Sequence, residues 1–225
     1  MDLRRECAKK AMGYIKNNSI IGLGAGRNIL ALIELISEEM KSGFKVKVVT
    51  PSDTTRKICF ERGIEVLPIH LVSEVDVAFD GCGEVDKNFY ASKGGGGVFL
   101  KEKLIGAMSK DYILLIDEEK FKENLTPNHI VTIEVIKSSL AYVNKKVKDL
   151  GGSPIVRKSS DKDGYLITDD GNLLVDISFE NILDFKKLNE ELRKIVGVVE
   201  TSIFTEEVSK LIVASEKEIR ILNRY

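Results

Sequence analysis

Tryptophan is absent from this chain of 225 residues, and histidine, cysteine and proline are scarce, with 2, 3 and 4 residues. Cys7, Cys59 and Cys82 are odd in number and lack the paired spacing of zinc ligands, so neither a disulfide scaffold nor a metal site is expected. No apolar run approaches the roughly 18 residues of a membrane span. The N-terminal segment MDLRRECAKKAMGYIKNN lacks the apolar core of a secretory signal. We therefore expect a cytoplasmic protein with no membrane partner.

The chain also lacks an excess of positive or negative charge. The 34 Lys and Arg residues nearly cancel the 35 Asp and Glu residues, and the sequence contains no basic stripe. A nucleic-acid partner is therefore not expected. The composition, 43% apolar and 31% charged, is that of an ordinary globular protein that is long enough for one or two domains.

The first half of the chain alternates short apolar runs with amphipathic segments. Strands are expected at residues 20–23, 45–49, 64–67, 75–79 and 112–116, and helices at residues 3–16, 29–40, 54–62 and around 102–103. This alternation predicts an α/β protein with a doubly wound, mostly parallel Rossmann-like sheet.

After Pro127 the pattern changes. Strands are expected at residues 130–136, around 155, at 173–177 and at 198–204, with helices at 138–150 and 184–195. The order β-α-β-β-α-β is that of a ferredoxin-like α+β domain. We expect residues 1–126 and 204–225 to form the Rossmann-like catalytic domain, with strands at 211–214 and 219–222 returning to the first sheet. Residues 127–203 would form an inserted ferredoxin-like domain that serves as a lid and in oligomerisation.

Candidate catalytic residues cluster between residues 74 and 103. Asp80 ends an apolar strand, Glu84 and Asp86 follow in a Gly-rich turn, Lys93 precedes four glycines, and Glu102 and Lys103 stand in an expected helix. Carboxylates and a lysine that follow strands suit proton transfer in an α/β protein, because ligands bind beyond the carboxyl ends of the strands. A solvated helix face is the alternative for Glu102, and a flexible hairpin is the alternative for the glycine run.

The segment GLGAGRN, residues 22–28, lies between a strand and a helix. A dinucleotide fingerprint needs G-x-G-x-x-G, but Arg27 stands at the third glycine position. A weaker interpretation remains, in which free N–H groups at the start of the helix bind an anion such as phosphate. The alternative is a tight turn with Arg27 in solvent.

Taken together, these motifs resemble one family. The order strand–GxGxG–helix, Ser52-Asp53, DGxxE at Asp80–Glu84, KGGG at Lys93–Gly96, Glu102-Lys103 and D-x-x-K at Asp117–Lys120 is similar to that of type A ribose-5-phosphate isomerase. The similarity continues through LGGSPIVRK, TDDGNLLVDI and VGVVE, and so covers nearly the whole chain.

The resemblance implies an aldose–ketose isomerase that interconverts D-ribose 5-phosphate and D-ribulose 5-phosphate in the non-oxidative pentose phosphate pathway, without metal or organic cofactor. Glu102 would be the base that moves a proton between C1 and C2 through an ene-diolate, with Asp80 and Lys93 completing the catalytic set. A second role for Asp80, in opening the furanose ring, stays open. The implied substrate-binding residues are Ala25, Gly26, Arg27, Asn28, Asp80, Gly81, Cys82, Gly83, Lys93, Gly94, Gly95, Gly96 and Lys120. Because the family is oligomeric, a homodimer or homotetramer is expected.

Two motifs depart from the family pattern. The family's GTGST loop has hydroxyl side chains where this chain has Ala25, Arg27 and Asn28, and the second Asp of DGADE is Gly83 here. We expect Arg27 to replace the lost hydroxyl contacts with a charge-assisted pair to phosphate. Two alternatives to the isomerase remain open, namely a related isomerase of another phosphosugar and a non-catalytic sugar-phosphate-binding or regulatory paralogue.

Overall fold

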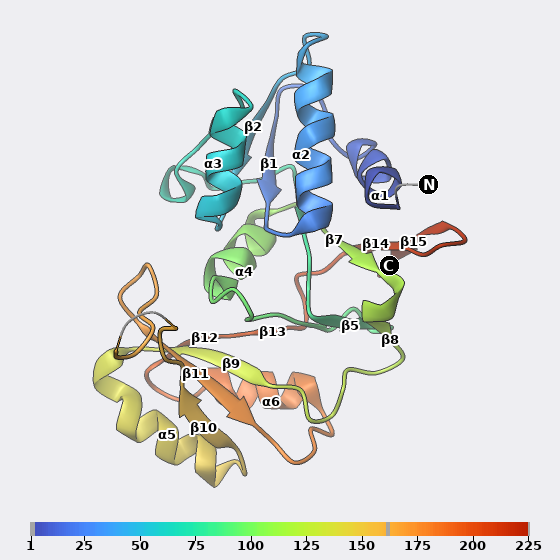
Figure 1. The fold of residues 1–225 in the computed structure, drawn as a ribbon. Coiled ribbons are helices and arrows are strands. Elements are labelled where there is room, and N and C mark those ends of the chain that lie inside the picture. The colour runs from blue at the N-terminus through green and yellow to red at the C-terminus, as the bar shows by residue number, and fades with distance from the viewer. Residues whose placement is uncertain (1–2, 161–162, 225) are drawn as a thin grey trace. The chain divides into compact units, whose positions relative to one another are not determined.

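The structure is a computed structural model that describes residues 3–160 and 163–224. Its contacts divide the chain into two compact units (Figure 1). Unit 1 comprises the chain up to Cys82, Lys101–Phe121 and the chain from Glu206 onward. Unit 2 comprises Gly83–Leu100 and Lys122–Thr205, so it is built from two separate stretches of sequence.

Unit 1 is built on a seven-stranded sheet. Its strands are β1 (Ser19–Leu23), β2 (Val46–Val49), β3 (Glu65–Val66), β4 (Val77–Asp80), β7 (Tyr112–Asp117), β14 (Lys210–Ala214) and β15 (Ile219–Asn223). Its helices are α1 (Leu3–Met12), α2 (Arg27–Met40), α3 (Asp53–Glu61) and α4 (Phe99–Met108), the last of which begins in unit 2. Short 3₁₀ helices cover Ile69–Leu71 and Glu118–Lys120.

The strands of this sheet follow the order β15-β14-β7-β4-β1-β2-β3. All neighbouring strands are parallel except β14 and β15. The chain builds from β1 through β2 to β3, then returns and places β4, β7 and β14 on the other side of β1. This is the Rossmann-type order, in which the direction of building reverses between β1 and β4. The predicted doubly wound sheet is confirmed.

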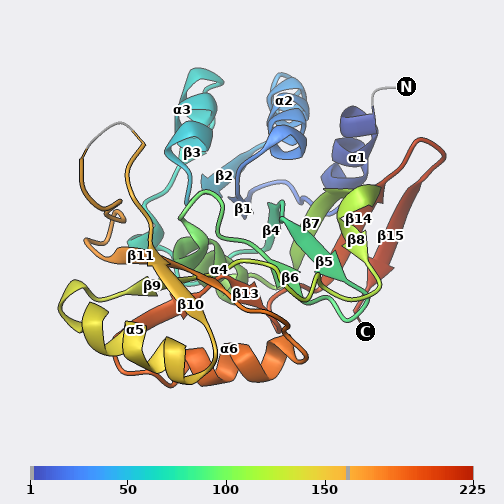
Figure 2. The same cartoon turned by 60° about the horizontal axis from the view of Figure 1, so that its bottom comes forward.

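Helices cover both faces of the unit 1 sheet. Helices α1, α2 and α3 lie side by side on one face, and α4 lies on the other (Figure 2). The sequence spacing predicts a buried stripe on α2, and the structure buries Ile29, Leu32, Ile33 and Ile36 in the core of the first face and packs Met40 against it, partly buried. On the second face, a Cβ at Gly22 would lie 2.5 Å from Ala78 Cβ and 2.6 Å from Ile105 Cγ2. A glycine in β1 therefore permits α4 to approach the sheet closely.

Unit 2 contains a four-stranded antiparallel sheet. Its strands are β9 (Val131–Val135), β10 (Ser153–Val156), β11 (Leu173–Ser178) and β12 (Val198–Thr201), and its helices are α5 (Leu140–Asp149), preceded by a 3₁₀ turn at Lys137–Ser139, and α6 (Phe185–Arg193). The strand order is β10-β11-β9-β12, and every pair is antiparallel. With the chain order β-α-β-β-α-β, this is the ferredoxin-like arrangement that the sequence predicts.

The two faces of this sheet differ in polarity. Alternate residues of β9 and β11 pack with apolar residues of α5 and α6 in one core, namely Val131, Ile133, Val135, Val175 and Ile177. The residues between them, Thr132, Glu134 and Asp176, are polar. Because successive side chains of a strand point to opposite faces, the sheet has one apolar face under the helices and one polar face.

A smaller sheet in the order β13-β6-β5-β8 corrects two expectations. The segment expected as turns forms β5 (Glu84–Asp86) and β6 (Ala91–Ser92), which pair antiparallel, while β8 is Phe121–Lys122. The single strand expected at residues 198–204 is wrong, because β13 (Ile203–Phe204) pairs with β6 rather than with β9. The chain changes its partner after Ser202, whose N–H still donates to Thr132 O at 2.8 Å.

This pairing also explains how the units divide. Ile203 pairs with Ser92 and Phe204 with Ala91, so the hairpin is joined to the chain that leaves the ferredoxin-like sheet. The segment Gly83–Leu100 therefore belongs to unit 2, whereas the expected division placed it in the first domain.

Candidate active site

The carboxyl ends of the central strands of unit 1 carry the first group of candidate residues. Gly24 follows β1 and Asp80 ends β4, on the two sides of the point where the strand order reverses. In open α/β sheets this switch point is where ligands bind. A Cβ at Gly24 would lie 1.9 Å from Asp80 Oδ1, so only a glycine permits this approach.

Asp80 is buried and held from several directions. Its Oδ1 accepts hydrogen bonds from the N–H of Gly81 at 2.7 Å and from the N–H of Ala25 at 3.4 Å. The hydroxyl of Tyr112 donates to Oδ2 at 2.9 Å. The carboxylate is thus fixed by groups from three segments of unit 1.

Tyr112 was not expected in the site. Its side chain is fully buried, and its pKa lies well above the ordinary value because of burial, the charges of Asp80 and Glu102 and the hydrogen bond to Asp80. The phenol therefore stays neutral and acts as a donor. A tyrosine in the otherwise aliphatic strand YILLI was the available signal, since a buried hydroxyl needs a polar partner.

Glu102 stands in the first turn of α4 and is buried. The partial positive charge at a helix N-terminus favours a carboxylate at this position. Glu102 is close enough for its charge to raise the pKa of Tyr112. The solvated helix face that was the alternative for this residue is therefore wrong.

Asp80, Glu102 and Tyr112 line one narrow crevice of unit 1, whose interior is too tight for a water molecule. Its other lining residues come from β1, from the turn after β2, from β4 and from α4: Gly22, Gly24, Pro51, Ala78, Phe79 and Ile105. Two carboxylates and a neutral hydroxyl thus meet at the switch point of the sheet. Such an arrangement can accept a proton from a ligand and return it.

The turn into α2 is held by other segments of unit 1. Gly26 has φ +116° and precedes the first residue of the helix, so the conformation favours glycine. Ser52 caps α3 by accepting from the N–H of Thr55 at 3.2 Å, and the hydroxyl of Thr55 donates to the carbonyl of Gly24 at 2.7 Å. The Ser-Asp motif thus supports the loop.

The residues of this turn that are candidates for binding phosphate differ in exposure and in hydrogen bonding. Ala25 and Arg27 are exposed at the start of α2. The side-chain amide of Asn28 instead donates to the carbonyl of Leu115 at 3.1 Å, which ties α2 to β7. Lys120 is half-buried in the 3₁₀ turn directly after β7, whose carboxyl end lies at the same edge of the parallel sheet.

The second group of candidate residues belongs to unit 2. The N–H of Lys93 donates to the carbonyl of Ser202 at 3.0 Å, and its Nζ lies 5.7 Å from the centre of the Phe204 ring. Gly94 has φ +102°, and a Cβ there would lie 3.0 Å from Ser202 Cβ and 3.0 Å from Thr132 Oγ1. The first glycine of the run therefore packs against the polar face of the sheet, whereas Gly95 and Gly96 are exposed.

Arg157 holds this turn from the ferredoxin-like sheet. Its Nη1 donates to the carbonyl of Gly94 at 2.9 Å, while Nε and Nη2 donate to the two carboxylate oxygens of Asp176 at 2.9 and 2.6 Å. Thr132 Oγ1 donates to the same carboxylate at 2.8 Å. Burial raises the pKa of Asp176, but the hydrogen bonds from Arg157 and Thr132 outweigh it, and the pKa lies below the usual value. Sequence reasoning missed this cluster, because its members are distant from Lys93 in sequence.

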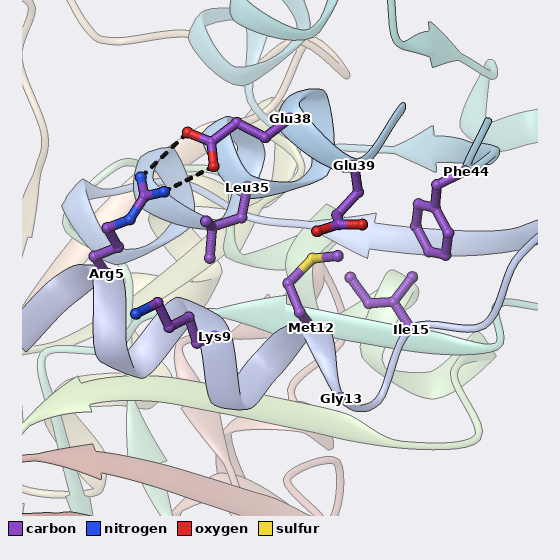
Figure 3. Close-up of a pocket in the computed structure, with 9 residues that line it drawn as sticks. All are labelled: Arg5, Lys9, Met12, Gly13, Ile15, Leu35, Glu38, Glu39 and Phe44. Carbon is purple, nitrogen blue, oxygen red and sulfur yellow. Dashed lines mark hydrogen bonds and ion pairs between the residues drawn. The ribbon is translucent and has the colours of Figure 1, made fainter. Parts of the chain in front are cut away.

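A larger cavity lies elsewhere in unit 1. It has a volume of about 450 Å³ and is lined by Arg5, Lys9, Met12, Gly13, Ile15, Leu35, Glu38, Glu39 and Phe44 (Figure 3). Arg5 spans its rim to Glu38 through two hydrogen bonds of 3.2 and 2.7 Å (Figure 3). None of the candidate residues lines this cavity. Size alone therefore does not identify the site.

The described part of the chain has neither a metal-binding cluster nor a membrane-spanning helix. Within residues 3–160 and 163–224, no cluster of three or more His, Cys, Asp or Glu residues could hold a metal ion. In those same ranges no helix has both the length and the apolar character for crossing a bilayer.

Comparison with known proteins decides the family. The family model for ribose 5-phosphate isomerase A (phosphoriboisomerase A) matches residues 47–218. The chain belongs to the ribose 5-phosphate isomerase A family. Ribose-5-phosphate isomerase A of Prochlorococcus marinus is 35% identical over 214 residues, covering 94% of this chain and 91% of the relative. That of Methanococcus vannielii is 33% identical over 224 residues, covering 99% and 93%.

Solved structures of the ribose 5-phosphate isomerase A family agree with the fold. The enzyme of Methanocaldococcus jannaschii has a TM-score of 0.89 at 30% identity, covering 99% of this chain and 98% of that chain. A D-ribose-5-phosphate isomerase in complex with phospho-erythronic acid has a TM-score of 0.90 at 30% identity, with the same coverage. Both expected folds, the Rossmann-like sheet and the ferredoxin-like arrangement, thus occur within one known architecture.

Proposed function

We propose that this protein interconverts D-ribose 5-phosphate and D-ribulose 5-phosphate. The observation that carries the proposal is the crevice of unit 1, in which Asp80, Glu102 and Tyr112 meet at the switch point of a doubly wound sheet. Membership of the ribose 5-phosphate isomerase A family supports the substrate. The solved relative with phospho-erythronic acid, a sugar-acid phosphate, supports the ligand class.

Glu102 is proposed as the base. It would take the proton from C2 of the aldose and return it to C1 of the ene-diolate, and a carboxylate at hydrogen-bond reach of both carbons can do both steps. Its place in the first turn of α4 favours the ionised form that the first step needs. Tyr112, a neutral donor, is proposed to position Asp80 rather than to exchange protons.

Asp80 and Lys93 are proposed to bind the sugar oxygens. Lys93, with the amides of Gly94, Gly95 and Gly96, would stabilise the negative charge that develops on the oxygen at C1 or C2 in the transition state. The packed turn that Arg157 holds supports this role, because preorganised donors need no rearrangement during the reaction. The amides of Gly81, Cys82 and Gly83 are proposed as further contacts.

The phosphate is proposed to bind at the start of α2. The N–H groups of Gly26, Arg27 and Asn28 suit an anion there, and this helix has no acidic residue in its first turn. The exposed guanidinium of Arg27 would replace hydroxyl contacts with a charge-assisted pair. Lys120 is proposed as a second cationic contact.

The proposal is tested by turnover of ribose 5-phosphate in the presence of a chelator, with Glu102→Gln as the comparison. We expect wild-type turnover and a loss of at least about a thousandfold in kcat for the variant, with binding of phospho-erythronic acid retained. A folded wild-type protein that isomerises another phosphosugar but not ribose 5-phosphate would contradict the substrate assignment. Binding without any turnover would contradict the enzyme.

The quaternary state and location are also proposals. We propose that the protein is a homodimer or homotetramer with subunit contacts made by unit 2, and that it acts in the cytoplasm. Sedimentation of the active protein tests the first proposal, and an active monomer would contradict it. Fractionation of the source cells tests the second.

A further inference from the structure

The motif Asp80–Glu84 leaves an open position at Gly83, where the family pattern has an aspartate. The backbone of Gly83 does not adopt the left-handed conformation that excludes side chains, so the backbone conformation does not require a glycine here. Its N–H donates to the carbonyl of Ser92 at 2.8 Å. A Cβ at Gly83 would lie 3.2 Å from that carbonyl oxygen and 3.8 and 3.9 Å from Cε1 and Nε2 of His129. The ring edge of His129 thus borders the space that a side chain at this position would enter.

His129 is oriented from its other side by a carboxylate. Its Nδ1 lies 3.9 Å from Oε2 of Glu84, within ion-pair range, and both side chains are largely buried, at 26% and 19% exposure. Thr126 fixes Glu84, since its N–H donates to Oε2 at 3.0 Å and its hydroxyl donates to Oε1 at 2.7 Å. The N–H of His129 donates to the carbonyl of Thr126 at 3.0 Å. Thr126 therefore holds both Glu84 and His129 in place.

Charge supports the same pairing. Burial raises the pKa of Glu84, but the hydrogen bonds from Thr126 and the charges of His129 and Lys122 outweigh it and hold the pKa below the usual value. The carboxylate is thus ionised at neutral pH and favours an imidazole N–H directed toward it. With Nδ1 turned to Glu84, the other ring nitrogen, Nε2, is left on the side of Gly83.

We propose that His129 binds the sugar phosphate in place of the carboxylate that Gly83 lacks, with Nε2 as the hydrogen-bonding atom and Glu84 as the group that orients the ring. This inference rests on the proposed isomerase function. It assigns a substrate contact to a loop between β8 and β9 that the sequence motifs do not include. An imidazole can donate to or accept from a sugar hydroxyl, whereas an ionised carboxylate can only accept.

Three variants test the assignment. His129→Gln should lower kcat/KM at least tenfold and weaken the binding of phospho-erythronic acid, measured by calorimetry. His70→Gln is the matched control, because His70 is the other histidine of the chain and is exposed. The double variant Gly83→Asp/His129→Ala should regain most of the lost kcat/KM, since removal of the ring makes room for the new carboxylate.

The readouts separate a substrate contact from a structural role. The loss in His129→Gln should appear as a raised KM for ribose 5-phosphate together with weaker binding of phospho-erythronic acid, and His70→Gln should change neither. His129→Gln with unchanged kcat/KM and unchanged binding would overturn the inference, and so would failure of the double variant to regain activity. Wild-type protein that binds phospho-erythronic acid but shows no turnover would contradict the proposed isomerase function only. The binding measurement would still test the role of His129. Wild-type protein that neither turns over nor binds would overturn both.

Discussion

The buried pair of Tyr112 and Asp80 allows a quantitative prediction. Tyr112→Phe removes the hydroxyl that donates to Asp80 Oδ2 at 2.9 Å and leaves the ring in place. A hydrogen bond to a charged group contributes about 1.5–3 kcal/mol, and its loss inside a protein leaves an acceptor without that donor. Oδ1 keeps its contacts with the amides of Gly81 and Ala25, so part of the stabilisation survives. We expect the free energy of unfolding to fall by about 2 kcal/mol.

Thermal and chemical unfolding measure this loss. A change of about 2 kcal/mol corresponds to a fall in Tm of about 4–8 °C for a chain of this size. The control is Tyr142→Phe, because Tyr142 is exposed on α5 and should leave Tm within about 1 °C. Since the hydroxyl also orients Asp80, kcat/KM should fall about tenfold, equivalent to about 1.4 kcal/mol in the transition state.

The pH dependence gives a second readout of the same variant. The pKa of Tyr112 is raised in the folded state, so its contribution to stability is fully present below the unfolded value of about 10 and is lost as pH rises through the folded value. Wild-type stability should therefore decline above about pH 10, and Tyr112→Phe should decline less steeply. Equal alkaline slopes, together with an unchanged Tm, would refute the assignment of a buried neutral donor.

Three further predictions concern the surroundings of the site. Gly24→Ala should lower kcat at least about a hundredfold, because the new Cβ would lie 1.9 Å from Asp80 Oδ1 and displace the carboxylate; near-normal turnover would contradict this. Arg157→Lys should lower kcat/KM about tenfold, since a lysine keeps the charge but loses the fork that holds the glycine turn; unchanged kinetics would show that the turn needs no such support. Arg27→Ala should raise KM for ribose 5-phosphate roughly tenfold with kcat retained, whereas Arg62→Ala, at an exposed arginine after α3, should not; equal KM values would remove Arg27 from the phosphate site.

Much of the fold could be predicted because its long elements have clear periodicity. The buried stripe of α2 shows a helical period, the continuous apolar run of β7 is typical of a buried strand, and Ser52 marks the start of α3. The strands β5 and β6, of three and two residues, are too short for any period to show. The change of strand partner after Ser202 could not be predicted either, because the pairing of β13 with β6 joins residues that are distant in sequence.

The site was predictable where one short segment carries several chemical groups. Asp80 and Glu102 are recognisable from their places after a strand and at the start of a helix, and the structure brings both to one crevice. Tyr112 and Arg157 were missed, since each acts through a partner that only the folded chain brings near. The side-chain amide of Asn28 donates to the carbonyl of Leu115 in β7, which the sequence did not indicate, so only its backbone N–H stays a predicted phosphate contact.

Proton transfer by Glu102 is tested most directly by isotope incorporation. Ribose 5-phosphate is incubated with the protein in D₂O with a chelator, and deuterium at C1 of the ketose and C2 of the aldose is followed by NMR. An ene-diolate mechanism predicts incorporation over repeated turnovers by the wild type, and none by Glu102→Gln although it still binds phospho-erythronic acid. Turnover without any deuterium, or incorporation that persists in Glu102→Gln, would contradict the account.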